Sequence, residues 1–141
     1  MNATQLGLLR ISFLVALAGT AGSLFLGEVM KFPPCTLCWY QRICLYPLVV
    51  VFGVGMWFED DTYKRYSLPL TILGLAIAAY HNLLYYGIIP ESISPCTQGV
   101  SCTTKQLELF GFITIPLMSL ATFAILSLFG LWSLQGSKKV Q

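Results

Sequence analysis

Four long apolar stretches constrain the fold of this chain more than any other feature. They run from about Leu6 to Leu26, Trp39 to Phe58, Leu68 to Ile89 and Phe110 to Leu134. Each is long enough to cross a hydrocarbon core of roughly 30 Å as a helix, which takes about 20 mostly apolar residues. Because 56% of the 141 residues are hydrophobic and 10% are charged, with a mean hydropathy of +0.73, an ordinary soluble domain is excluded. The sequence predicts an all-α integral membrane four-helix bundle, with residues 1–141 as a single transmembrane domain.

The connections between these stretches are short, so we expect any chemistry in the loops or within the membrane. The net charge of +2, without a basic patch beyond Lys138 and Lys139, gives no indication of nucleic-acid binding. Arg10 followed by an apolar run and small residues is also the pattern of a signal peptide. That run continues through Leu24-Phe25-Leu26, beyond any plausible cleavage point, so we interpret it as the first span.

The basic residues predict the orientation in the bilayer. Cytoplasmic loops carry an excess of lysine and arginine, and a cytoplasmic N-terminus places most of the basic residues on that side. The inner side then holds Arg10, Lys64, Arg65, Lys138 and Lys139, while the outer loops hold Lys31 and Lys105 and the outer end of the second span holds Arg42. We therefore expect both termini inside (N-in/C-in). The two cysteine-bearing loops, around Cys35 and Cys96, then face the outside, where disulfides form and persist.

Cys35 and Cys38 lie where a polar loop gives way to the second apolar stretch. Pro33 and Pro34 cannot continue a preceding helix, so we expect Cys35 in the loop and Cys38 in a first helical turn. The partial positive charge of a helix N-terminus stabilises a thiolate, which is the reactive form of cysteine. Arg42, one turn after Cys38, adds a full positive charge on the same face. This pattern indicates a redox-active pair.

The remaining cysteines are a second outer pair and a single residue inside the second stretch. Gly99 permits a turn between Cys96 and Cys102 that can bring them within disulfide reach. Cys44 lies within the apolar stretch, where a lone cysteine usually acts as a small apolar filler. The two pairs therefore carry the chemistry in this interpretation.

Three interpretations of the two cysteine pairs remain open. Static disulfides fit Cys35 and Cys38 poorly, because a bridge across two residues closes too small a loop to stabilise much. A metal site of four thiolates is disfavoured because C-x-x-C followed by C-x5-C is not the usual zinc pattern. Electron exchange between the pairs, with an acceptor in the membrane, accounts for their position next to the lipid. A lipid-soluble quinone suits such a site.

The third stretch contains Tyr80-His81-Asn82, in which His81 is the only histidine of the chain. An ionisable residue within a span is by default a site hypothesis, because burying it in lipid is costly. The alternative, that His81 reaches interfacial water or forms a hydrogen bond across helices, stays open. Small residues four apart, at Ala18 and Gly22 and at Gly74 and Ala78, predict close helix approach.

Together these features resemble the DsbB family of bacterial quinone-dependent thiol oxidases. The resemblance covers nearly the whole chain. It is carried by Cys35-x-x-Cys38 at the start of the second span, by Trp39-Tyr40-Gln41-Arg42 behind it, by a second external cysteine pair, and by Phe110-Gly111 followed by Pro116. The small size and the short loop between Cys96 and Cys102 are most similar to the BdbC type of Gram-positive bacteria.

The resemblance implies a thiol:quinone oxidoreductase of the bacterial cell membrane. Its partner would be a DsbA-like thiol oxidase, BdbD-like in this type, which introduces disulfides into secreted proteins and is reoxidised by this chain. The acceptor would be the membrane quinone pool, with menaquinone favoured by the Gram-positive resemblance and ubiquinone as the alternative.

The resemblance also implies roles for individual residues. In the family mechanism the reduced partner attacks a Cys96 to Cys102 disulfide at Cys96, the released Cys102 engages Cys35, and Cys38 becomes the thiolate that contacts the quinone. Arg42 matches the family arginine beside the quinone ring. His81 resembles a histidine near the same site.

One departure and two alternatives accompany this resemblance. Larger members have a long segment with a surface helix inside the second pair, and five residues cannot hold one, so the order of intermediates is open. The vitamin K epoxide reductase group has similar chemistry, but its C-x-x-C follows the loop pair, whereas here it comes first. Outside enzymes, a metal-handling membrane protein or an inert scaffold subunit is the alternative.

Overall fold

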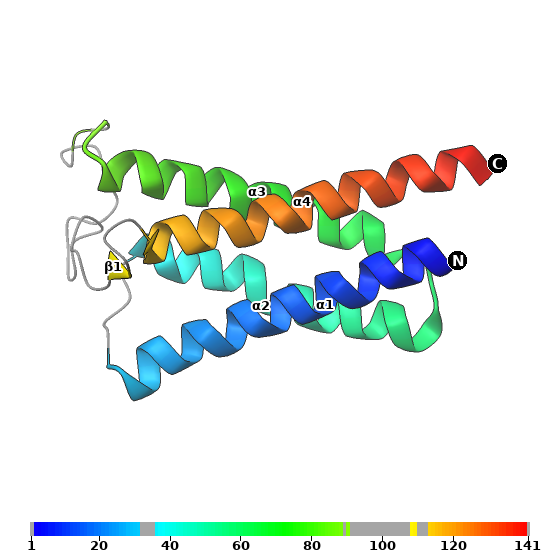
Figure 1. Ribbon diagram of the computed structural model, residues 1–141, viewed down its shortest axis with the longest axis horizontal. Helices are drawn as coiled ribbons and strands as arrows, with labels where there is room; N and C mark the ends of the chain where they lie inside the picture. The colour runs from blue at the N-terminus through cyan, green and yellow to red at the C-terminus, as the bar shows by residue number, and fades with distance from the viewer. Residues whose placement is uncertain (1, 32–35, 89, 91–107, 110–112, 141) are drawn as a thin grey trace.

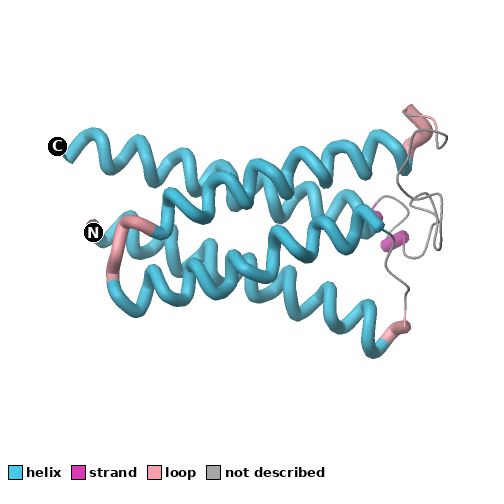
Figure 2. Tube along the Cα trace, turned by 180° about the vertical axis from the view of Figure 1, so that it is seen from behind, coloured by secondary structure: helices cyan, strands magenta, loops and turns pink. Residues whose placement is uncertain are grey.

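The fold consists of four long helices that run side by side (Figures 1 and 2). The computed structural model describes residues 2–31, 36–88, 90, 108–109 and 113–140. The helices are α1 (Ala3–Leu24), α2 (Thr36–Phe58), α3 (Tyr63–Tyr85) and α4 (Ile115–Val140). Each contains a segment long and apolar enough to cross a membrane. The predicted all-α four-helix membrane bundle is confirmed.

The helices form a closed ring of neighbours. Each packs against the next along the chain, and α4 also packs against α1. Both termini and the turn between α2 and α3 lie at one end of the bundle, while the C-terminal end of α1 and the start of α2 lie at the other (Figure 1). The end of α3 and the start of α4 also lie at this second end. The described residues that flank both cysteine-bearing segments are therefore at the same end of the molecule.

The core of the bundle is apolar, and so is much of its outer surface. Leu48, Phe123 and Leu126 are almost completely buried between the helices. Val50 and Trp57, by contrast, are exposed on the outside of α2, with Trp57 84% exposed. A soluble protein rarely exposes so many large apolar side chains, so this surface is suited to lipid.

The third helix begins earlier than the hydropathy pattern predicts, at Tyr63 instead of about Leu68. The turn before it is closed by Asp60, whose Oδ1 accepts hydrogen bonds from the backbone N–H of Thr62 at 3.0 Å and from its hydroxyl at 2.7 Å. These two bonds lower the pKa of Asp60. Because the helix starts with a polar turn, the apolar pattern alone missed it. At the other end, Gly87 has a φ of 78°, and Ile88 N–H donates to the Leu83 carbonyl, which ends α3 with a Schellman motif.

The fourth helix begins later than predicted, at Ile115 instead of about Phe110. Two short strands precede it: β1 (Glu108–Leu109) and β2 (Ile113–Thr114) pair in antiparallel fashion. Thr114 then caps the helix, because its Oγ1 accepts a hydrogen bond from the Leu117 N–H at 3.3 Å. Pro116 lies in the first turn, where its missing N–H has no cost.

The first helix continues past its predicted end. After α1, a π-helical segment, η1 (Phe25–Val29), extends the span to Val29, and Lys31 follows with a φ of 55°. π-Helical turns are rare and are often found at functional sites. The wider turn rotates the side-chain directions of its residues around the helix axis relative to those of α1. It thereby changes which residues Gly27 contacts.

The prediction that small residues four apart mark close helix approach is correct for α3 and wrong for Gly22 of α1. A Cβ on Gly74 would lie 2.2 Å from the Phe123 ring, and Ala78 is fully buried, so α3 and α4 do approach closely there. For Gly22 the prediction is wrong, since nothing lies within 4 Å of the position of an added Cβ. Gly22 and Ala18 instead border a cavity.

Candidate functional site

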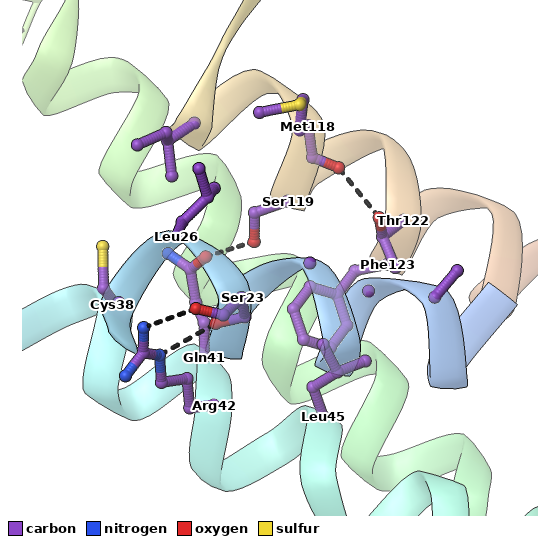
Figure 3. A pocket seen from close by; sticks show the side chains of 15 residues that line it. Ser23, Leu26, Cys38, Gln41, Arg42, Leu45, Met118, Ser119, Thr122 and Phe123 are labelled. Carbon is purple, nitrogen blue, oxygen red and sulfur yellow. Dashed lines mark hydrogen bonds between the residues drawn. The ribbon is translucent and has the colours of Figure 1, made fainter. Parts of the chain in front are cut away.

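A cavity of about 270 Å³ lies between α1, α2 and α4, close to the end of the bundle that carries the flanks of the cysteine segments. This volume is near the lower end of the range of about 300–1,000 Å³ typical of small-molecule sites. The walls are mostly apolar, and six of the lining residues bear polar or reactive groups (Figure 3). These are Ser23, Cys38, Gln41, Arg42, Ser119 and Thr122.

One face of α2 supplies the reactive part of the wall. Cys38, Gln41, Arg42 and Leu45 are spaced three and four residues apart, so they lie along the same side of the helix. Since α2 begins at Thr36, Cys38 lies in the first turn, as predicted. The expectation that Cys38 and Arg42 share a face is also confirmed, because both line this cavity.

The guanidinium of Arg42 is held by neutral groups of α1. Its Nε donates to the Ser23 hydroxyl at 2.9 Å, and its Nη2 donates to the Ser23 carbonyl at 3.1 Å (Figure 3). The guanidinium carbon lies 5.3 Å from the centre of the Trp39 ring, within the range of a cation–π interaction. An arginine has five N–H donors, so donors remain for a ligand.

Gly27 makes room for this arrangement. A Cβ at Gly27 would lie 2.9 Å from Arg42 Nη2, closer than real Cβ contacts allow. Among the residues that the structure describes, Arg42 forms no ion pair with a carboxylate. No carboxylate of this described part neutralises its positive charge, which therefore acts on whatever occupies the cavity.

Gln41 connects three helices and was missed as a site residue by the sequence analysis. Its Oε1 accepts a hydrogen bond from the Ser119 hydroxyl of α4, as Figure 3 shows. Its Nε2 lies 3.0 Å from Nδ1 of His81 on α3. The spacing of three residues from Cys38 was the available signal, since it places Gln41 on the same helix face as the cysteine.

His81 lies behind Gln41, away from the cavity wall. Its side chain is 2% exposed, and His81 is not among the residues that line the cavity. Of the two interpretations left open, a hydrogen bond across helices is what the structure shows. The adjacent Asn82 does the same, since its Nδ2 donates to the Pro116 carbonyl of α4 at 2.8 Å. Direct contact between His81 and a cofactor stays a prediction.

The cysteines divide between the cavity, the core and the segments that are not described. Cys44 is buried in the main apolar cluster, next to Leu48 and Phe52, which confirms its role as a small core residue. Cys35, Cys96 and Cys102 lie outside the described residues. Of the four predicted catalytic cysteines, the structure thus places Cys38, beside Arg42 and Gln41 on the cavity wall.

This arrangement is suited to thiol chemistry in an apolar environment. Cys38 lies at a helix N-terminus, where the partial positive charge favours the thiolate. The charge of Arg42, one turn away on the same face, acts in the same direction. Because the cavity walls are mostly apolar, both electrostatic effects are stronger than they would be at a solvated surface.

Comparisons with known proteins agree with this chemistry. The family model described as "Disulfide bond formation protein DsbB" matches residues 5–133. A probable disulfide formation protein of Metapseudomonas resinovorans is 45% identical over 122 residues, which are 86% of this chain and 85% of that protein. Disulfide bond formation protein C of Bacillus subtilis (strain 168) is 42% identical over 121 residues, 86% of this chain and 88% of that protein. A probable disulfide formation protein of Chlamydia caviae is 42% identical over 131 residues, 93% of each chain. No solved structure matches the chain.

A membrane helix bundle with a cysteine and a cation on the wall of an apolar cavity defines a class, the membrane-embedded thiol oxidoreductases. The family match, and these relatives, which the chain covers almost completely, identify one family within this class. The chain belongs to the DsbB family of disulfide bond formation proteins, and it is a membrane disulfide-forming oxidoreductase. The resemblance inferred from the sequence, including that to the disulfide formation protein C of Bacillus, is confirmed.

Proposed function

We propose that this chain is a thiol:quinone oxidoreductase that reoxidises an extracytoplasmic DsbA-like, BdbD-like thiol oxidase. The observation that carries the proposal is the shared cavity of Cys38 and Arg42, which opens within the membrane-spanning part of the bundle. A soluble acceptor would not need such a site. A lipid-soluble one would reach it from the bilayer.

The residues present fit a quinone. Leu26, Leu45 and Met118 are among the apolar lining residues that a flat ring can pack against. The N–H groups of Arg42 not used by Ser23 can donate to a carbonyl oxygen. A bound quinone supplies a two-electron acceptor inside the membrane. Menaquinone and ubiquinone both have this chemistry, and we favour menaquinone because of the likeness to the Bacillus proteins.

The cysteines then form a relay of thiol–disulfide exchanges. The partner's dithiol attacks a disulfide between Cys96 and Cys102 and is itself oxidised to a disulfide, which leaves the loop pair reduced. A second exchange oxidises the loop pair and breaks a disulfide between Cys35 and Cys38. Cys38 is left as the thiolate on the cavity wall, stabilised by Arg42 and by the helix N-terminus.

The proposal also fixes an orientation. The end of the bundle with both termini and the α2–α3 turn carries Lys64 and Arg65, and Lys138 lies near the C-terminus. A preference of basic residues for the cytoplasm puts this end inside. The whole chain then acts as one transmembrane domain of the bacterial cell membrane, with both cysteine loops on the extracytoplasmic side, where the partner is found.

Anaerobic mixing of the purified protein, quinone and reduced partner tests this function, with thiols and quinone absorbance followed together. Wild type is expected to oxidise one partner dithiol for each quinone reduced, and Cys38→Ser is expected to lose quinone reduction. Cys44→Ala is the matched control, since Cys44 lies on the same helix but in the apolar core, and it is expected to retain activity. Partner oxidation without quinone reduction, or full activity in Cys38→Ser, would refute the proposal.

A further inference from the structure

The Gln41 amide is fixed from both sides. Ser119 Oγ–H donates to its Oε1, and the amide nitrogen faces His81. An amide nitrogen has no lone pair to offer, and Nδ1 of His81 is therefore the acceptor in the 3.0 Å contact. This places the proton of the neutral imidazole on Nε2. The interaction has a direction: His81 and Ser119 together determine which way the Gln41 amide points.

The Gln41 Nε2 carries two hydrogens, and His81 accepts one. Within the part of the chain that the structure describes, no other protein acceptor takes the second. Gln41 is 6% exposed and lines the cavity, so water is largely excluded from this N–H group. A buried donor without an acceptor is unfavourable, and the cavity ligand is the available source of an acceptor.

We propose that Gln41 is a second ligand-binding residue, whose Nε2–H donates to a carbonyl oxygen of the quinone, and that His81 is a positioning residue that acts through Gln41. The inference rests on the proposed function. A quinone has two carbonyl oxygens and no donor, which matches a wall that offers donors from Arg42 and Gln41. If the amide rotated, its Oε1 would face the same carbonyl oxygen and repel it.

Three substitutions separate these roles. Gln41→Met keeps the length of the side chain and removes the amide, His81→Leu removes the acceptor for Nε2, and Ser119→Ala removes the donor to Oε1. Quinone affinity is measured by titration, and KM and kcat are measured with reduced partner in excess. Tyr63→Phe is the matched control, because it removes a buried hydrogen bond between helices, to Ser133, at the opposite end of the bundle.

We expect Gln41→Met to raise the quinone KM and Kd about tenfold, the effect of losing one buried hydrogen bond. His81→Leu is expected to raise them several-fold, roughly as much as Ser119→Ala, while Tyr63→Phe leaves them unchanged. The decisive measurement is the double variant. If His81 acts through Gln41, His81→Leu has no further effect on affinity in the Gln41→Met background.

The measurements distinguish a failure of this inference from a failure of the proposed function. If wild type reduces no quinone, the proposed function is wrong and this inference is wrong with it. If wild type turns over and Gln41→Met has an unchanged quinone affinity, the inference alone is overturned. If the effects of His81→Leu and Gln41→Met multiply, His81 contacts the quinone independently, which overturns its positioning role. Should His81→Leu fail to fold, His81→Phe, which fills the same buried site without an acceptor, provides the cycle with Gln41→Met instead.

Discussion

Gly27→Ala tests the position of Arg42 with a single methyl group. The added Cβ would lie 2.9 Å from Nη2 and 3.7 Å from Cζ of the Arg42 guanidinium. Because the guanidinium is the far end of a flexible side chain, it moves more easily than the helices do. Its movement weakens the 3.1 Å hydrogen bond from Nη2 to the Ser23 carbonyl. Hydrogen bonds to charged groups contribute about 1.5–3 kcal/mol, and we expect a partial loss of about 1 kcal/mol in the positioning of the donor.

A loss of this size corresponds to a roughly fivefold increase in the quinone KM and Kd. The fold itself should not suffer, because alanine is favoured over glycine in a helix by roughly 0.5–1 kcal/mol. The assay is quinone titration and steady-state turnover of purified variants, with thermal unfolding in the same detergent. Gly7→Ala is the matched control, since nothing lies within 4 Å of its added Cβ.

Arg42→Ala sets the upper limit of the effect. If it raises the quinone KM and Gly27→Ala does not, the contact with Ser23 is irrelevant to ligand binding. If Arg42→Ala also leaves quinone affinity unchanged, the role of Arg42 as a donor to the ligand is refuted. If Gly27→Ala unfolds at a lower temperature than Gly7→Ala, the backbone has moved instead of the guanidinium, which contradicts the reasoning above.

Two further predictions concern the fold. Gly74→Ala would place a Cβ 2.2 Å from Phe123 Cε1 and 2.5 Å from Cδ1, so we expect overpacking to lower the stability of the bundle by about 1–3 kcal/mol. Thermal unfolding measures this loss, and Phe123→Leu should restore part of the stability. A neutral Gly74→Ala would contradict the close approach of α3 and α4. Glu59→Gly should stabilise the bundle by up to about 1 kcal/mol, because Glu59 has a φ of 49° after α2, a conformation that glycine adopts without strain; a lower unfolding temperature would contradict this.

The number of helices was predictable because a span in lipid needs a long apolar segment. The helix ends were less predictable, since they depend on hydrogen bonds that hydropathy does not record. Asp60 closes the turn before α3, and Thr114 caps α4, so one helix begins before and the other after its apolar stretch. The π-helical segment after α1 had no sequence signal that we recognised. Gly22 shows the same limit, because small residues mark close packing and cavities alike.

The site was predictable where it depends on one helix. The spacing of Cys38 and Arg42 on α2 determines that they share a face, whatever the other helices do. Gln41 was missed because its role depends on Ser119 and His81, which α4 and α3 bring to it from far along the chain. His81 was identified as unusual from its place in a span, yet the sequence does not show that Gln41 lies between it and the cavity.

The way Arg42 is held bears on the chemistry of Cys38. A charged side chain inside a membrane protein is usually stabilised by an opposite charge, but here a hydroxyl and a backbone carbonyl serve instead. Glu28, next to Gly27, is exposed and forms no ion pair with Arg42. A carboxylate partner would cancel the positive potential on the cavity wall, and a thiolate at Cys38 would then be stabilised by the helix N-terminus alone. The hydroxyl and carbonyl of Ser23 hold the guanidinium in place without cancelling its charge, which would then stabilise a thiolate at Cys38.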